Sequence, residues 1–308
     1  MSTIFVSIAS YLDVELEQTV TDLLSKAKHP ENLHLSVNSQ NREGAHPDLE
    51  TLCSKYNAGL TYVKADFRSS KGTCSARKIC QLPLNDSFTY YMQIDSHTLF
   101  LQDWDSVLID DYERCKSRWG SYIFSTYPIS YYYQDDEIKF ESKKDNIPNC
   151  LAIVPSKHFS RYTGHYKAYR GDEYGERTDY FAGGFSFGYA SHFLKVPYDN
   201  RIYHSGEEPT ISIRFFAEGI AIVCPPNNYV WHHYSGGTCN RRRSHWDKED
   251  DWDEAEKAKI MSEIYALSED TLNKFYNHEL EYPYSIKDPA KLDEWLLKVT
   301  HDKFDLYI

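Results

Sequence analysis

The sequence predicts an α/β fold, with a mainly parallel central sheet and helices on both of its faces. Strand-length apolar runs alternate with amphipathic segments through residues 3–94. Hydrophobic residues make up 41% of the 308 and charged residues 26%, a composition that lets a chain of this length bury a core. Strands that alternate with helices need crossover connections, which favour parallel pairing with both faces of the sheet covered.

The elements of the first half follow this alternation in order. Residues 3–9 are a short continuous apolar run, which is typical of a buried strand. A helix is expected over 13–28 because its apolar residues recur at helical spacing, and His29-Pro30 ends it. The remaining elements expected here are strands at 33–39, 60–63 and 90–94 and helices at 47–56 and 76–81.

The second half predicts shorter strands between loops that are rich in Tyr, Gly and Asp. The strand-like runs lie at 122–126, 150–154, 184–189 and 221–224. Helices are expected at 254–267 and 289–299, after a strongly charged stretch that begins at Asp247. We therefore expect a main domain over residues 1–246 and a small helical extension over 247–308.

Charge and cysteine usage narrow the class of protein. A net charge of −12 makes nucleic acid an unfavourable partner, because binding to its phosphates needs a basic field. The seven cysteines are odd in number and form no CxxC pair, which fits a reducing compartment. The N-terminal apolar run breaks at residues 10–13, too early for a signal peptide or a membrane span. These observations predict a cytoplasmic protein with no integral membrane segment, and they leave its oligomeric state open.

Polar residues follow three of the predicted strands, at the edge of the sheet where ligands bind in parallel α/β folds. They are residues 9–13, 64–66 and 95–97. Asp13 is better interpreted as the cap of the following helix, whereas Asp66 fits a turn and a ligand contact equally well.

The segment Asp95-Ser96-His97 is the most informative of these strand ends. A carboxylate and an imidazole two residues apart lie on the same side of an extended chain. Together they can bind one divalent ion, and the imidazole favours Mn²⁺ over Mg²⁺. Ser96 is a further candidate for ligand contact. A distant run containing His232 and His233 could supply a third metal ligand, or hold a packed core histidine.

Three other segments contain candidate binding groups. Arg241–Arg243 follow the glycine pair 236–237 and could close over a diphosphate, with Arg242 as the candidate ligand, or form a solvated basic surface. The glycines at 183–184 let a ligand approach the backbone closely. Glu207 and Glu208 open a helix-like run and could orient a substrate hydroxyl or take its proton. Acidic residues also stabilise a helix N-terminus in their own right.

In combination these motifs resemble the retaining glycosyltransferases of the GT-A fold that use nucleotide sugars. The resemblance is greatest to the GlcNAc-transferase family that includes the cytoplasmic enzyme acting on hydroxyproline in Skp1. The polypeptide GalNAc-transferases are similar more distantly. The matching segments, in the family's order, are 4–20, SARK at 75–78, YYMQIDSHTLF at 90–100, QDWD at 102–105, FAGGFSFG at 181–188, GEEPTISIR at 206–214 and VWHHY at 230–234.

The resemblance implies a Rossmann-like GT-A fold and a metal-dependent, retaining transfer of a sugar to a hydroxyl of a protein or glycan. GlcNAc from UDP-GlcNAc is the implied donor. Asp95, His97 and His233 (or His232) would bind Mn²⁺ or Mg²⁺, and Glu207 and Glu208 would contact sugar or acceptor hydroxyls as the catalytic pair. The remaining donor contacts that it implies are Ala9, Ser10, Tyr11, Asp66, Arg77, Gly183 and Gly184. Residues after 247 match nothing in the family, so the acceptor stays open.

Two other functions are compatible with such a fold. A sugar-nucleotide nucleotidyltransferase would show a glycine-rich basic loop after the first strand, but the sequence there is ASYLDVE. A non-catalytic carbohydrate-binding protein on the same fold is disfavoured because Asp95, His97, both glutamates and the histidine pair are all present.

Overall fold

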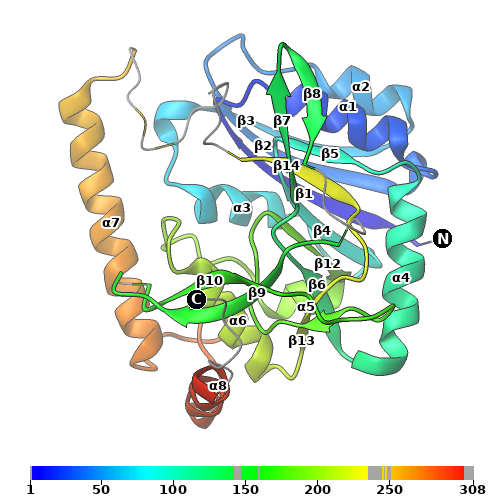
Figure 1. Cartoon of the computed structure of the whole chain (residues 1–308). Helices are drawn as coiled ribbons and strands as arrows, with labels where there is room; N and C mark the ends of the chain where they lie inside the picture. The colour runs from blue at the N-terminus through cyan, green and yellow to red at the C-terminus, as the bar shows by residue number, and fades with distance from the viewer. Residues whose placement is uncertain are drawn as a thin grey trace.

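The computed structural model describes residues 2–141, 147–158, 160–234, 245, 247 and 251–301, without the side chains of 299–301. An eight-stranded central sheet has the strand order β11-β13-β6-β12-β4-β1-β2-β3 (Figure 1). Its strands are β1 (Ile4–Tyr11), β2 (Leu33–Asn41), β3 (Gly59–Asp66), β4 (Tyr90–Asp95), β6 (Tyr122–Ser125), β11 (Glu176–Arg177), β12 (Phe185–Tyr189) and β13 (Ala221–Cys224).

The predicted α/β fold is confirmed, and the strands predicted within residues 3–94 form one parallel half of the sheet. β1 pairs in parallel with both β2 and β4, and β2 pairs in parallel with β3. The other half is mixed, because β12 runs antiparallel to β4 and β6 while β13 is parallel to β6. The carboxyl ends of β1 and β4 lie side by side, with Ala9 opposite Asp95.

Helices cover both faces of this sheet, as the strand–helix alternation requires. One face is buried under α1 (Leu16–Lys26), α2 (Leu49–Lys55) and α4 (Trp104–Trp119). The opposite face is buried under α3 (Thr73–Gln81), α5 (Ala190–Lys195) and α6 (Glu207–Ala217). Successive residues of a strand alternate between the two faces. In β1, for example, Val6 packs under the first set of helices and Phe5 under the second.

The helix α4 was not among the predicted elements, although the sequence contains a signal for it. Trp104, Leu108, Tyr112 and Cys115 are all fully buried and recur every three or four residues, which is helical spacing. Gly120 ends the helix with a positive φ of 66°, as glycine commonly does after a helix C-terminus.

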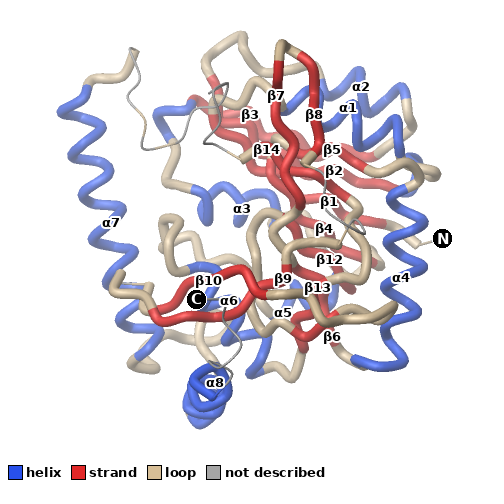
Figure 2. The backbone as a smooth tube through the Cα atoms, viewed as in Figure 1, coloured by secondary structure: helices blue, strands red, loops and turns tan. Residues whose placement is uncertain are grey.

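Two smaller sheets accompany the central one, a four-stranded sheet that begins just after β4 and a two-stranded sheet beside α6 (Figure 2). One has the order β5-β14-β7-β8 and contains β5 (Thr98–Phe100), β7 (Ile129–Gln134), β8 (Glu137–Phe140) and β14 (Val230–His233). The other is the antiparallel pair β9 (Cys150–Pro155) and β10 (Tyr162–Lys167). Because β14 pairs with β5, with His232 opposite Thr98, the distant histidine run lies beside residues 95–97.

The C-terminal helices pack against the sheet domain. α7 (Glu254–Tyr276) extends beyond the predicted 254–267 and runs along one side of the molecule, and α8 (Ala290–His301) lies below it (Figure 1). Leu272 of α7 is buried among core residues of α6, and Trp295 of α8 is buried against Leu151 and Ile213. The domain boundary at residue 246 stays a prediction. Among the described residues, no helix combines the length and apolar character needed to cross a bilayer.

Replacing Trp295 tests whether α8 is part of this core. Trp295 has no exposed surface, whereas Leu297 on the same helix is 60% exposed. We expect Trp295→Ala to lower the free energy of unfolding by about 3–5 kcal/mol, because a large buried ring leaves a cavity. The matched control Leu297→Ala should change it by less than about 0.5 kcal/mol. Urea unfolding measures both, and equal losses would contradict the burial of α8.

Candidate functional site

A polar cavity of about 270 Å³ opens at the carboxyl ends of β1 and β4. Most of the site residues predicted from the first 100 positions line it, and so do several that were not predicted. The lining residues are Ala9, Ser10, Tyr11, Asp13, Gln40, Ser70, Gly72, Thr73, Ala76, Arg77, Asp95, Ser96, His97, His204, His232 and His245.

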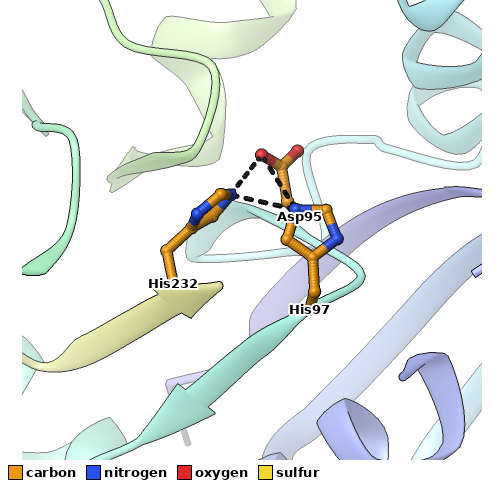
Figure 3. A group of neighbouring side chains, drawn as sticks. All are labelled: Asp95, His97 and His232. Carbon is orange, nitrogen blue, oxygen red and sulfur yellow. Dashed lines mark hydrogen bonds and ion pairs between the residues drawn. The ribbon is translucent and has the colours of Figure 1, made fainter. Parts of the chain in front are cut away.

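Three of these side chains converge on one point. The His232 Nε2 atom lies 3.1 Å from Asp95 Oδ2 and 3.0 Å from His97 Nε2 (Figure 3). His97 Nε2 lies 3.9 Å from the same carboxylate oxygen. The three ligand atoms are all within 4.8 Å of one another, so one divalent cation could contact all of them.

Strand register explains why His232, rather than His233, joins Asp95 and His97. Neighbouring residues of a strand point in opposite directions. His232 therefore faces the cavity, while His233 Nδ1 lies 2.7 Å from Glu15 Oε1 on the other side of β14. The Tyr131 hydroxyl donates to the second oxygen of Glu15 at 2.6 Å. Burial raises the pKa of Glu15, but these two contacts outweigh it and lower the pKa overall.

Asp13 has a larger role than the helix cap expected for it. Its carboxylate accepts hydrogen bonds from the Ser96 hydroxyl at 2.6 Å and the Glu15 amide at 2.9 Å, and lies 2.7 Å from His97 Nδ1. α1 begins only at Leu16, after Asp13. Burial raises the pKa of Asp13, but the charge and hydrogen bond of His97 lower it overall. Since a carboxylate only accepts, His97 Nδ1 donates, and in the neutral ring Nε2 offers its lone pair to the three-residue group.

Arg77 of α3 also lines the cavity and contacts this group. Its Nη2 atom lies 2.9 Å from Asp95 Oδ1 and donates to the Gly183 carbonyl at 3.1 Å. The guanidinium is buried, with only 6% of the side chain exposed. Burial alone would raise the pKa of Asp95, yet Arg77, followed by the two histidines, holds it well below its usual range. Asp95 is therefore a carboxylate at neutral pH.

The paired glutamates are near the group but do not line the cavity. Glu207 Oε1 lies 3.6 Å from Arg77 Nη1, and burial with the neighbouring charge of Glu208 raises the pKa of Glu207 to about 6, against the lowering effect of His204. Glu208 accepts hydrogen bonds from the hydroxyls of Tyr127 at 2.6 Å and Tyr180 at 2.8 Å. Its other oxygen accepts from the Gly183 amide at 2.8 Å.

The two glycines lie beside these groups, as close approach of the backbone requires. A side chain at Gly183 would collide with the guanidinium of Arg77. A methyl group at Gly184 would lie 3.6 Å from Asp95 Oδ2 and 3.9 Å from the His232 ring, so this residue forms part of the wall around the three-residue group.

Asp66, one of the predicted donor contacts, does not line the cavity. Asp66 ends β3, where its carboxylate binds the exposed Arg68 side chain at 3.0 Å instead of lining the cavity. Arg242, with the rest of the basic run 241–243, lies outside the described residues.

Two residues that were not predicted from the sequence, Gln40 and His245, line the cavity in which Asp66 was expected. Gln40 at the end of β2 accepts a hydrogen bond from the Ser70 hydroxyl at 3.1 Å. His245 lies edge-on to the Tyr11 ring, with 4.9 Å between the ring centroids, and its Nδ1 is 2.8 Å from the Tyr203 hydroxyl. Burial lowers the pKa of His245 to about 4, so the imidazole is neutral at pH 7. Gln40 could have been predicted from the sequence, because it is a polar residue near the end of the strand that lies next to β1.

Solved structures with the same fold include glycosyltransferases. GalNAc-T7, in a crystal structure with UDP, GalNAc and Mn²⁺, aligns with a TM-score of 0.59 at 14% identity over 97% of this chain and 55% of its own. Staphylococcus aureus TarS aligns with a TM-score of 0.51 at 10% identity over 99% of this chain and 44% of its own. The chain thus spans about half the length of these structures, and at such low identity the likeness shows the fold. No curated protein sequence matches it.

The sequence itself matches a family model over nearly its whole length. The model describes glycosyltransferases of the GlcNAc type, and it matches residues 3–61 and 50–279. The expectation that nothing after residue 247 matches the family is therefore wrong. Those ranges include β1, the Asp95–His97 segment, both glycines, both glutamates and β14. The GT-A fold implied by the sequence motifs is confirmed by the solved structures. The chain belongs to the GlcNAc glycosyltransferase family.

Proposed function

We propose that this protein transfers a sugar from a UDP-sugar, most simply GlcNAc from UDP-GlcNAc, to an acceptor hydroxyl with the help of a divalent cation. The observation on which the proposal depends is the convergence of Asp95, His97 and His232 at the end of β4. Membership of the GlcNAc glycosyltransferase family supports the reaction class. The UDP, GalNAc and Mn²⁺ in the GalNAc-T7 structure support the kind of donor and metal.

The three side chains fit a metal ion in their chemistry. One carboxylate and two imidazoles suit Mn²⁺ better than Mg²⁺, which prefers oxygen ligands alone. Asp13 fixes the ring of His97 by accepting from Nδ1, as an outer carboxylate commonly does for a metal-binding histidine. The bound ion would supply Lewis-acid stabilisation of the departing diphosphate.

The rest of the cavity fits the donor nucleoside. Backbone and side-chain groups of Ala9, Ser10 and Tyr11 lie along one wall, next to Gln40 and the neutral His245. This wall offers aromatic surface and hydrogen-bonding groups without a cation, which suits an uncharged base and ribose. The diphosphate would then lie toward Asp95 and His97, where Ser96 is also part of the lining.

For the retaining transfer that the sequence resemblance implies, the positions of the carboxylates favour attack on the same face as the departing diphosphate over double displacement. A double-displacement mechanism needs a carboxylate nucleophile at the anomeric carbon. Among the described residues that line the cavity, the carboxylates are Asp13 and Asp95, and both are engaged with His97 or Arg77. Glu208 is held by three donors. We propose that Glu207 and Glu208 shape the sugar pocket by fixing Arg77 and Gly183, while a diphosphate oxygen helps to take the acceptor proton.

Removing a metal ligand tests the proposal directly. Purified protein incubated with UDP-GlcNAc and Mn²⁺ should slowly release UDP even without an acceptor, and EDTA should suppress this release. Asp95→Ala and His97→Ala should each lower the rate by about 100-fold or more, because each removes a group that stabilises the leaving charge.

A matched control distinguishes this effect from general damage. Asp172→Ala also removes an aspartate from an ion pair, that with Arg118 at 2.7 Å, but on an exposed surface where such pairs contribute little. It should leave the rate unchanged. Release that persists in Asp95→Ala in the presence of EDTA would show that the metal assignment is wrong.

The pKa of Glu207 predicts a pH-dependent stability. The pKa rises from its ordinary value of 4.5 to about 6 in the folded protein because the side chain is buried. Between these values the folded state holds a proton that the unfolded chain has lost, so stability falls as pH rises. We expect the gain in unfolding free energy from Glu207→Gln to be about 2 kcal/mol larger at pH 7.5 than at pH 4. Denaturant unfolding at both pH values measures it, and an equal gain would contradict the buried, destabilised carboxylate.

A further inference from the structure

A second cavity, of about 710 Å³, lies beside the first and has no role in the function proposed above. It is open at the surface between β7 and the β9–β10 pair. Tyrosines and polar groups dominate its walls. The lining residues are Ser130, Glu141, Ile147, Pro148, Asn149, Cys150, Tyr166, Lys167, Tyr169 and Tyr234.

One thin wall, formed by Pro128 and Tyr234, separates the two cavities. The Tyr234 ring packs on the His232 ring with centroids 4.1 Å apart, and its hydroxyl donates to the Pro128 carbonyl at 2.8 Å. Pro128 also lies close to Gly184, which borders the candidate metal group. A methyl group at Gly184 would be 3.7 Å from Pro128 Cδ and 3.6 Å from Asp95 Oδ2. A molecule in the second cavity would therefore lie within one side chain of the candidate metal group.

A second connection reaches the pocket proposed for the transferred sugar. The Tyr166 ring meets Tyr127 edge-on, with 6.2 Å between their centroids. The Tyr127 hydroxyl donates to Glu208, which accepts from the Gly183 amide in turn. Tyr127 and Glu208 thus connect the second cavity to Gly183, while Tyr234 separates it from the candidate metal group.

The lining chemistry is suited to a sugar ring. Tyr166 is 52% exposed, so its ring is available to a ligand, and Tyr169 and Tyr234 also line the cavity. Aromatic rings pack well against the apolar face of a pyranose, while Asn149 and Glu141 offer hydrogen-bonding groups to its hydroxyls. The volume is in the range of pockets that enclose small organic ligands.

Charge disfavours an anionic acceptor here. Lys167 is the one cation among the described lining residues, and it is paired with Glu176 at 2.7 Å. Glu141 adds a negative charge to the cavity, where its carboxylate accepts a hydrogen bond from Ser130. The described lining therefore offers an anionic acceptor no cation that is not already paired, so a neutral acceptor fits it better.

We infer that this cavity is the acceptor subsite and that it binds a neutral glycan. The inference rests on the proposed function, because it names the molecule that receives the sugar. Tyr166 would stack on the acceptor ring, and the acceptor hydroxyl would reach past Pro128 and Tyr234 toward the donor.

The test measures binding of the protein to an array of neutral oligosaccharides, sialylated and phosphorylated oligosaccharides, and peptides containing Ser, Thr or hydroxyproline. We expect one or more neutral oligosaccharides to bind. Tyr166→Ala should weaken that binding about tenfold or more, and Tyr166→Phe should restore it, because the ring and not the hydroxyl makes the contact. The matched control Tyr132→Ala removes a tyrosine that is 45% exposed and outside the cavity, and it should bind as the wild type does.

Thermal stabilisation by UDP and Mn²⁺, measured on the same samples, separates the two proposals. A wild-type protein that binds glycan but not UDP would contradict the proposed donor and leave the glycan subsite supported. Preferential binding of peptides or anionic glycans, no binding to the array, or binding that Tyr166→Ala leaves unchanged would each overturn the acceptor inference.

Discussion

The buried guanidinium of Arg77 connects the segments from which the candidate site is built. It lies on α3, binds Asp95 at the end of β4, donates to the carbonyl of Gly183 and lies near Glu207 at the start of α6. A single buried cation thus lies between two carboxylates that would otherwise repel each other, and it also holds the backbone at the glycine pair. Loss of Arg77 would leave the buried Asp95 carboxylate without its cation, and such an uncompensated charge costs about 3–5 kcal/mol. The geometry around Asp95 therefore depends on α3 being in place.

The segment between β1 and α1 holds two of the histidines in position, as Arg77 holds Asp95. Asp13 binds His97, and Glu15, two residues later, binds His233. His97 lies in the turn between β4 and β5 and His233 lies in β14, far apart in the sequence, yet one short loop orients both. Thr19 of α1 adds a clamp, since its hydroxyl donates to the Ser96 carbonyl and accepts from the Thr98 amide, both at 2.9 Å. His233, although it faces away from the cavity, positions its neighbour His232 by fixing β14.

Sequence patterns predicted the strands and helices that depend on local periodicity. They did not predict site residues whose positions depend on contacts between distant segments. The strands and helices within residues 3–94 follow from apolar spacing, and their order requires Asp95 and residues 9–11 to meet. The choice between His232 and His233 depends on the register of β14 against β5, which adjacent histidines cannot reveal. Asp13 was underestimated because a cap before a helix explained it locally. Asp66 ends a strand at the sheet edge, one strand too far from β1, so Gln40 takes the position nearer the cavity.

The arrangement of the two cavities follows from how the small sheets are attached. β14 pairs with β5, which continues directly from the turn after β4, and β7 pairs with β14 in turn. Pro128 and Tyr234 immediately flank β7 and β14, so the pairing of these strands places Tyr234 against His232 and Pro128 beside Gly184. A wall built in this way keeps a fixed distance from Asp95, His97 and His232, as the proposed orientation of the reactants requires. The same strand pairing that brings His232 to the donor side fixes the partition beyond which an acceptor would bind.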